Sequence, residues 1–575
     1  MDLRARGGCR AILLGYSVLG CALTASVGCG SSSHYPPPTV FVDGGADSVG
    51  NSPDTRGMGG ATGGPSVGPG AQALVTGDQL LLVGNGPDSC TNQDPAVGDR
   101  WCAFARPSTF LGGTDLWVIN VSKAVGGKAI QCNASDLDCL LLTSTLNDGD
   151  LTIHRFFGDT LIYYADSGAA SGPVYGWRPG MNAGRKLTAA TGLNCVGNSK
   201  SDSVICFDRQ DTTTVPGDTS ADLLAGKLSA DAGLLPKVAT LLVVAGGDAV
   251  GIRKYQVGLS PSGDWVAWST RAVATGPEIL SAQRVNDDPS RIVVATDVAR
   301  WAFSPDGAKW YWLKSFNYSV NGNPLGTLQM ANFPTDTGGV APAASDLRAN
   351  VASFGPAGDK GLVYFGPLTG GLGELGLIGD RDASTVVKSI DSRALRVLAI
   401  SRDGRTLVYS KTVSSDQSSF DLYAGGLDLA APCLLTATAN SPPPYGTLSE
   451  PATTAFWSYG DALTNELVGE YTTLATCRTM KFSTNLWFWT AVKDKGVVYA
   501  DTVAGTSFAD LTVTLRYAEF AAGALPTSGT VLQERANQIY AVLLPAVSAV
   551  VYTINTGGAT DGLYVKAGLP FAPTP

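Results

Sequence analysis

From about residue 72 to the C-terminus, short apolar runs alternate with clusters of Gly, Pro, Ser and Asp. The apolar runs are rich in Val, Leu, Thr and aromatic residues, which favour strands, whereas the intervening residues favour turns. The pattern predicts an all-β domain over residues 72–575 with many short strands. Residues 30 to about 70 lack this alternation and hold seven glycines between positions 57 and 70. Such a segment cannot bury enough apolar surface to fold.

One segment recurs four times in register. Each copy has an apolar residue, a turn that contains Gly and a second apolar strand, and the copies are residues 259–268, 303–312, 354–364 and 400–409. The turn glycines Gly263, Gly307, Gly358 and Gly404 are spaced 44, 51 and 46 residues apart. A repeat of this length is typical of one four-stranded blade of a β-propeller.

The turn residues explain why each copy should form a hairpin. Pro fixes its own φ, Asp306 and Asp403 can accept hydrogen bonds from the backbone two residues on, and Gly takes the positive φ that closes the turn. Aromatic residues recur on the strand that follows the turn. Most of them are expected in the core between blades, and the set is Trp265, Trp268, Trp310, Trp312, Tyr364 and Tyr409.

Weaker copies of this strand extend the repeat in both directions. They lie at 101–104, 161–164, 204–207, 497–499 and 550–552, so that nine candidate strands are found, and the stretch 445–490 could hide another. We predict one propeller of about eight four-stranded blades, with seven to nine open. The last blade lacks an outer strand near the C-terminus. The run Gln79–Val83, or the run just before it, is a candidate to supply that strand and close the ring.

These turns and strands resemble the repeat of the periplasmic protein TolB and of the propellers that cap some oligopeptidases. The four clear copies cover about 150 residues. The resemblance implies a β-propeller that binds a protein partner at the cell envelope. The TolB family also has an N-terminal α/β domain, and only a short linker occupies that place here. A role in a Tol system therefore does not follow.

The N-terminus has the features of an export signal. Three Arg precede the apolar run 11–23, which is too short to span a bilayer comfortably. Residues 26–29 resemble a lipobox, and they predict cleavage after residue 28 and lipidation of Cys29, with Cys21 as the alternative and an ordinary cleaved signal peptide as the competing interpretation. Residues 29–71 would then be a disordered tether with a reach of roughly 35 Å. Gly30 after the Cys favours the outer membrane.

The charge balance narrows the choice of partners. Charged residues make up 15% of the chain, and the pI is about 4.9. Binding to nucleic acid needs a basic face that neutralises phosphates, and no run of Lys and Arg provides one. The composition therefore argues against nucleic-acid binding.

Eight cysteines follow Cys29, and an even number in an exported chain predicts disulfides. Nearest-neighbour pairing is one of 105 possible connectivities. It gives the pairs Cys90–Cys102, Cys132–Cys139, Cys195–Cys206 and Cys433–Cys477. The competing interpretation is a metal site. It is disfavoured because no CxxC spacing occurs and His34 and His154 are the two histidines.

The sequence offers no convincing catalytic site and no cofactor motif. Residues 64–68 match G-x-S-x-G but lie in the predicted tether, without the strand and helix that a nucleophile elbow needs. His154 would have to serve any Ser-His-Asp triad, with Asp148, Asp150 or Asp159 beside it. Turns between strands give the same picture, so the sequence favours a structural role for these residues. We predict no catalytic residue, no metal and no cofactor.

Three functions are compatible with these observations. The first is a non-catalytic envelope lipoprotein whose propeller binds a protein partner or scaffolds an assembly. The second is an enzyme that acts on glycans or peptides with carboxylates at the propeller channel. The third is a surface protein with an adhesive role.

Overall fold

The fold was analysed in a computed structural model of the chain. It describes residues 75–76, 79–84, 91–92, 101–107, 114–125, 138–144, 154–164, 173–189, 193–208, 220–229, 233–242, 257–271, 278–285, 287–314, 325–333, 343–359, 361–369, 372–381, 384–412, 420–439, 446–449, 452–460, 467–492, 496–504, 512–519, 529–537, 541–544, 549–554, 562–566 and 569. The predicted signal peptide (1–28), the tether (29–71) and the lipidation candidates Cys21 and Cys29 lie outside this set. No helix among the described residues has the length and hydropathy needed to span a bilayer.

The chain is all-β, as predicted, and the described strands form eight antiparallel sheets. Five sheets have four strands each. They are β3 (Thr91–Asn92), β4 (Trp101–Pro107), β5 (Thr114–Asn120), β6 (Cys139–Ser144); β7 (His154–Phe157), β8 (Thr160–Tyr164), β9 (Val174–Trp177), β10 (Arg185–Lys186); β11 (Leu193–Gly197), β12 (Ser203–Asp208), β13 (Ser220–Lys227), β14 (Lys237–Leu242); β29 (Gly446–Leu448), β30 (Thr454–Gly460), β31 (Leu467–Thr473), β32 (Arg478–Ser483); and β33 (Leu486–Val492), β34 (Gly496–Ala504), β35 (Thr512–Glu519), β36 (Thr530–Asn537). A short helix, α1 (Val121–Val125), follows β5.

Two sheets have seven strands and one has five. The seven-stranded sheets are β15 (Val257–Leu259), β16 (Trp265–Arg271), β17 (Glu278–Arg284), β18 (Asp287–Phe303), β19 (Lys309–Lys314), β20 (Gly326–Asn332), β21 (Ala344–Val351); and β22 (Ser353–Ala357), β23 (Gly361–Thr369), β24 (Leu372–Arg381), β25 (Ser384–Ile400), β26 (Thr406–Thr412), β27 (Phe420–Gly426), β28 (Cys433–Ala439). The five-stranded sheet has the order β1 (Val75–Thr76), β2 (Gln79–Gly84), β39 (Gly562–Lys566), β38 (Ala549–Ile554), β37 (Ala541–Leu544).

Each seven-stranded sheet contains two four-stranded units that share a long strand. The first part of β18 pairs with β17 and its last part pairs with β19, with a register shift between the two. Asp297 lies at this break with a φ of 61°, a conformation that non-glycine residues seldom adopt. The two halves of the sheet then pack face to face, because Trp265 of β16 and Trp310 of β19 belong to one buried cluster. Strand β25 is shared in the same way.

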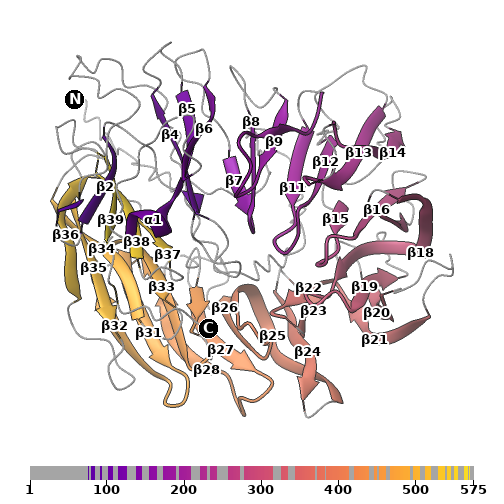
Figure 1. The fold of residues 1–575 in the computed structure, drawn as a ribbon. Coiled ribbons are helices and arrows are strands. Elements are labelled where there is room, and N and C mark those ends of the chain that lie inside the picture. Colours follow the sequence, from indigo (N-terminus) through magenta and orange to yellow (C-terminus); the bar gives the residue numbers. More distant parts are fainter. Residues whose placement is uncertain are drawn as a thin grey trace, which may run out of the picture.

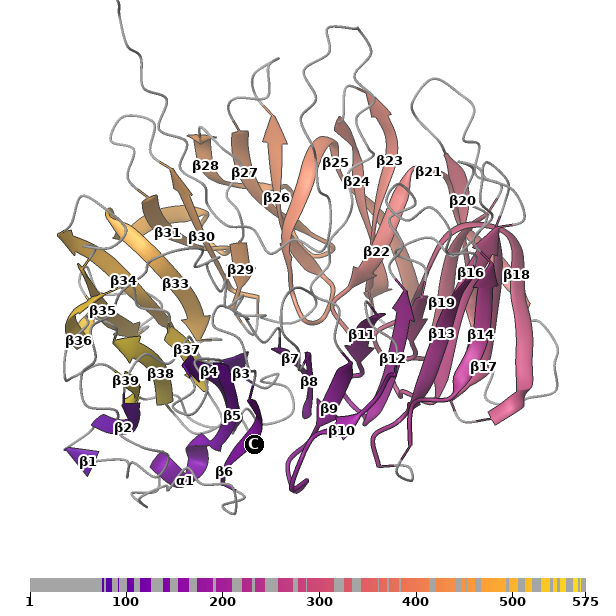
Figure 2. The same ribbon diagram turned by 90° about the horizontal axis from the view of Figure 1, so that it is seen from above.

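The sheets follow one another in chain order around a ring, in which each colour gives way to the next (Figure 1). The same succession is seen from above in Figure 2. Each sheet contacts the next one, and β37 of the five-stranded sheet contacts β3 of the first four-stranded sheet. Strand β2 from the N-terminal part pairs with β39 near the C-terminus, with Gln79 opposite Lys566. This is the strand that the sequence proposed as the outer strand of the last unit.

The core lies between neighbouring units. One cluster joins Trp101 and Leu116 of β4 and β5 to Leu161 and Trp177 of β8 and β9, and similar clusters fill the other described boundaries. A single position recurs in this core. The fourth residue of each second strand is almost fully buried, and these residues are Phe104, Tyr163, Cys206, Trp268, Trp312, Tyr364, Tyr409, Trp457, Tyr499 and Tyr552.

All six aromatic residues that the sequence assigned to the repeat are buried, with at most 4% of their surface exposed. Burial of a large aromatic ring removes 150–250 Å² from water. The recurring aromatic position therefore supplies much of the apolar surface that holds one unit against the next. This set acts as core and leaves none of its members on an exposed face.

Candidate functional site

The turn between the first and second strands of a unit has the same construction in several units. The predicted glycines have positive φ values of 78° at Gly263, 74° at Gly307, 55° at Gly358 and 71° at Gly404. The backbone N–H of Gly307 donates to the carbonyl of Ser304 at 2.8 Å, and Gly404 donates to Ser401 at the same distance. These hydrogen bonds close tight turns that only Gly adopts without strain.

A buried serine organises the turn from the inside. The Ser304 hydroxyl donates to Asp306 Oδ1 at 2.5 Å and accepts from the backbone N–H of Lys309 at 2.9 Å. Asp306 Oδ1 also accepts from the N–H of Ala308 at 3.0 Å. Burial alone would raise the pKa of Asp306, but these hydrogen bonds and the charge of Lys309 together hold that pKa below its usual value. Ser401 and Asp403 repeat the arrangement.

Turns of neighbouring units also bind one another. Asn198 Nδ2 donates to the carbonyl of Ser260 in the next unit at 2.7 Å. The backbone N–H of Asp359 donates to the carbonyl of Arg402 at 2.5 Å, and Arg402 Nε lies 3.0 Å from the Asp359 carboxylate. We call the face formed by these first-to-second-strand turns the turn face. Its hydrogen bonds cross unit boundaries and stiffen this side of the ring.

Two turns of this kind were not predicted from the sequence because they lack the glycine. The Asn198 N–H donates to the carbonyl of Ser203 between β11 and β12, and Ser449 Oγ accepts from the N–H of Thr454 between β29 and β30. The signal in the sequence was a buried Ser or Asn five residues before the second strand. The second turn shows that the stretch 445–490 does contain a further unit.

The opposite face carries connections of variable length. Second strands run away from the turn face, so the links to third strands emerge on the other side. Five residues or fewer separate the first and second strands at 198–202, 260–264, 304–308 and 358–360, whereas the links between second and third strands range from two residues at 370–371 to eleven at 209–219 and 315–325. We call this side the connection face. Its links differ in length from one unit to the next.

Several acids with low exposure lie on third strands, where the second strand separates them from the first, innermost strand. Glu278, at the start of β17, is 1% exposed and accepts a hydrogen bond from Ser269 at 2.6 Å. Glu374 of β24 accepts from Arg348 Nη2 at 3.0 Å and from the Tyr364 hydroxyl at 3.3 Å. These acids brace neighbouring strands and do not line the innermost strand.

Glu470 of β31 is another buried acid. It is 4% exposed, and its Oε1 accepts from the Tyr459 hydroxyl at 3.0 Å. Burial raises the pKa of Glu470, and the hydrogen bonds from Tyr459, Thr436 and Trp457 and the charge of Lys481 offset only part of that effect. Trp457 is directly opposite Glu470 in the register.

Of the residues considered for catalysis, only Asp159 has a described side chain. His154 begins the innermost strand β7, but its side chain is not among the described residues, and neither are Asp148, Asp150 and residues 64–68. Asp159 makes an ion pair of 3.6 Å with Arg178. No group of three or more His, Cys, Asp or Glu side chains in the described part of the chain is arranged to hold a metal.

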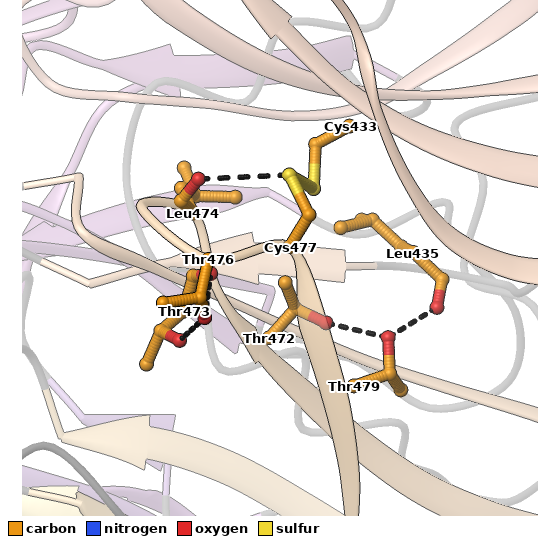
Figure 3. The surroundings of a disulfide bond; sticks show 8 residues. All are labelled: Cys433, Leu435, Thr472, Thr473, Leu474, Thr476, Cys477 and Thr479. Atoms are coloured by element: carbon orange, nitrogen blue, oxygen red, sulfur yellow. Dashed lines mark hydrogen bonds between the residues drawn. A yellow bond between two sulfur atoms is a disulfide. The ribbon is translucent and has the colours of Figure 1, made fainter.

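Two of the predicted disulfides are confirmed. Cys195 and Cys206 stand directly opposite each other on β11 and β12, with their Cα atoms 4.0 Å apart. Cys433 of β28 is bonded to Cys477, which lies in the turn between β31 and β32, and the Cα atoms are 5.6 Å apart (Figure 3). Cys102 and Cys139 each take part in a disulfide as well. Their predicted partners, Cys90 and Cys132, lie outside the described residues.

Comparisons with known proteins do not assign a family. No family model matches the chain, and no curated protein matches it. Among solved structures, a eukaryotic initiation factor aligns with 74% of this chain and 96% of its own, at 10% identity and a TM-score of 0.41. An oligogalacturonate lyase in complex with manganese aligns with 73% of this chain and 97% of its own, at 13% identity and a TM-score of 0.30.

Prolyl oligopeptidase B from Galerina marginata aligns with 64% of this chain, at 10% identity and a TM-score of 0.34. This chain covers 55% of that enzyme. At such TM-scores, none of these similarities indicates an activity, a substrate or a partner for this chain. The resemblance to TolB-like repeats therefore stays a prediction from the sequence.

Proposed function

We propose that this protein is a non-catalytic envelope lipoprotein that binds a protein partner through the connection face of a closed β-propeller. The proposal has three parts: a rigid ring, one face suited to recognition and a lipid anchor at Cys29. Each part is supported by different residues, so an experiment can contradict one part without contradicting the others.

The ring is proposed to be a propeller of ten blades. Ten second strands with the same buried fourth residue support this count, which exceeds the seven to nine suggested by the sequence. The pairing of β2 with β39 and the contact of β37 with β3 support closure, because together they join the two ends of the described chain. A closed ring leaves no end sheet exposed.

The observation that carries the binding role is the difference between the two faces. On the turn face, the first-to-second-strand turns at 198–202, 260–264 and 304–308 are short, and their polar groups are used within and between units. On the connection face, links of different lengths follow rigid strands, and binding residues are disproportionately found on loops that a rigid scaffold positions. An acidic chain with variable loops on one side suits a partner that offers a basic or mixed surface.

The anchor follows from the sequence alone. A lipid chain at Cys29 followed by the Gly-, Pro- and Ser-rich segment would tether the ring to a membrane, and the outer membrane is the proposed location. A tether of this length would let the ring turn its connection face toward a partner at the same surface.

The direct test is to purify the mature protein from membranes after crosslinking in cells, in parallel with Cys29→Ala. We expect one defined partner to copurify with the wild-type protein, and we expect Cys29→Ala to leave the membrane fraction. Failure to recover any partner would overturn the binding role. Turnover of an envelope glycan or peptide by the purified protein would contradict the non-catalytic assignment.

A further inference from the structure

The two fully described disulfides differ in what they join. Cys195–Cys206 links two neighbouring strands of one hairpin that is already hydrogen-bonded along its length. Cys433–Cys477 links the last strand of a seven-stranded sheet to the turn before β32 in the next sheet. We propose that Cys433–Cys477 is a clasp between two sheets that a dithiol reductant can open while Cys195–Cys206 stays closed.

Access to the sulfur atoms differs in the same direction. Cys477 lies in an exposed turn, whereas Cys433 is 3% exposed and belongs to a buried apolar cluster. Cys195 and Cys206 are 9% and 0% exposed. Disulfide exchange requires a thiolate to reach a sulfur atom, so the rate depends on access. A reductant can approach Cys477 from solvent but must disrupt a packed boundary to reach the other pair.

The chemistry is a two-electron reduction by a dithiol. One thiolate of the reductant attacks Cys477 Sγ, the S–S bond breaks, and Cys433 leaves as a thiolate that takes up a proton. The second thiol of the reductant, as its thiolate, then displaces Cys477 from the mixed disulfide. The products are two protein thiols and the oxidised reductant, so sulfur, protons and electrons balance.

The backbone around Cys477 favours opening once the bond is broken. Cys477 has a φ of 52°, a left-handed conformation that is unfavourable for a residue with a Cβ. Its N–H donates to the carbonyl of Thr473 at 3.0 Å. The hydroxyl of Thr476 donates to the same carbonyl, and Figure 3 shows Thr473 and Thr476 joined in this turn. The disulfide holds this turn against β28. Without it, the turn can relax toward ordinary φ values.

The clasp covers a strand that is poorly protected otherwise. Strand β28 is the last strand in its sheet, its seven residues carry no charge, and Leu434 is 44% exposed. A side-chain hydrogen bond from Thr479 Oγ1 to the carbonyl of Leu435, at 2.5 Å, joins β28 to β32 next to the disulfide. Uncharged edge strands readily pair with other chains. Reduction would expose such an edge.

The experiment has two readouts on the full-length mature protein. The first is timed alkylation during treatment with dithiothreitol, with each cysteine followed by mass spectrometry. We expect Cys433 and Cys477 to become alkylated at least about tenfold faster than Cys195 and Cys206, in line with the dependence of reactivity on exposure. Equal rates for the two pairs would overturn the proposal.

The second readout is hydrogen exchange of backbone amides after selective reduction. We expect amides in 433–439 and 478–483 to exchange about tenfold faster or more, because local opening governs exchange, while 193–208 stay unchanged. Unchanged exchange at 433–439 would overturn the proposal even if the cysteines reduce quickly.

Variants without each disulfide test the same boundary. Cys433→Ala with Cys477→Gly removes the bond and relieves the positive φ, and we expect it to exchange like the reduced protein. Cys195→Ala with Cys206→Ala is the matched control and should leave exchange at 433–439 unchanged. If the control pair loosened β28 as much as the clasp pair, the proposed boundary role would be wrong.

Discussion

The hydroxyl of Tyr409 donates a hydrogen bond to Asp391 Oδ2 at 2.9 Å, across the point where the shared strand β25 passes from one unit to the next. Lys411 Nζ lies 3.2 Å from Asp391 Oδ1 and 5.7 Å from the centre of the Tyr423 ring. Tyr409 thus occupies the buried fourth position of its strand, and its hydroxyl also links the two neighbouring units through the carboxylate of Asp391.

Tyr409→Phe should lower the free energy of unfolding by about 1–2 kcal/mol, because it removes a hydrogen bond to a charged group but keeps the ring. Tyr163→Phe is the matched control. Tyr163 fills the equivalent position and stacks on Tyr175 as Tyr409 stacks on Tyr423, but among the described residues no carboxylate accepts a hydrogen bond from it. Urea unfolding of both variants tests this. Equal losses would contradict a specific role for the Tyr409–Asp391 hydrogen bond.

Gly404→Ala should be much more damaging than Gly180→Ala. Both glycines have positive φ, but a Cβ at Gly404 would lie 2.3 Å from the carbonyl oxygen of Ala357, whereas a Cβ at Gly180 would meet no atom within 4 Å. We expect a cost of about 1 kcal/mol at Gly180 from the backbone alone and about 3 kcal/mol or more at Gly404. Thermal unfolding measures both, and similar values would show that the turns do not pack on each other as described.

The sequence predicted the units best where local chemistry specifies them. The Ser-Pro-Asp-Gly turn around Gly307 and the strand with Trp310 and Trp312 were identified from their pattern, because turn residues and aromatic spacing are local signals. The unit around Trp457 was left open within the stretch 445–490, because Ser449 forms its turn without glycine. The shared strand β18 could not be foreseen either, because its division depends on which neighbours each half finds.

The candidate site was less predictable than the fold. The role of Glu470 depends on residues of other strands that pack around it, and these neighbours are not visible in a linear sequence. The disulfide between Cys433 and Cys477 was predicted by pairing each cysteine with its nearest neighbour in the sequence. That this disulfide joins two sheets became visible only with the strand order.

Glu470 and Asp306 should affect stability with opposite dependence on pH. The raised pKa of Glu470 means that the folded state favours the protonated acid, so its contribution opposes folding at neutral pH and this penalty disappears as the pH falls below the usual value for Glu, about 4.3. The lowered pKa of Asp306 means that its carboxylate supports folding above about pH 3.9, and this support is lost as the pH falls through the folded-state value.

Glu470→Gln should therefore raise stability relative to wild type at pH 7, and the gain should shrink toward pH 4. Asp306→Asn should lower stability at pH 7, and the loss should shrink toward pH 3. Urea unfolding of the three proteins between pH 3 and pH 7 gives both differences. The interpretation of Glu470 is wrong if Glu470→Gln is destabilised at neutral pH and recovers in acid.

Closure by β2 can be tested with an engineered disulfide. Gln79 and Lys566 are directly opposite in the antiparallel register, where Cα separations of about 4.5–5.5 Å suit a disulfide. Gln79→Cys with Lys566→Cys should form the crosslink, found by mass spectrometry of the unreduced digest. Leu80→Cys with Lys566→Cys is the control, because neighbouring residues on a strand point to opposite faces. Equal crosslinking of both pairs would mean that β2 is not held in this register.

The most direct test of the central claim asks which face of the ring meets a partner. A photo-crosslinking amino acid placed at Lys314, which ends second strand β19 on the connection face, should capture the copurifying protein in cells, because that side chain is exposed there. The same amino acid at Ser262, exposed on the turn face, should not capture it. The account predicts capture from Lys314 alone. Capture from Ser262 with none from Lys314 would contradict it.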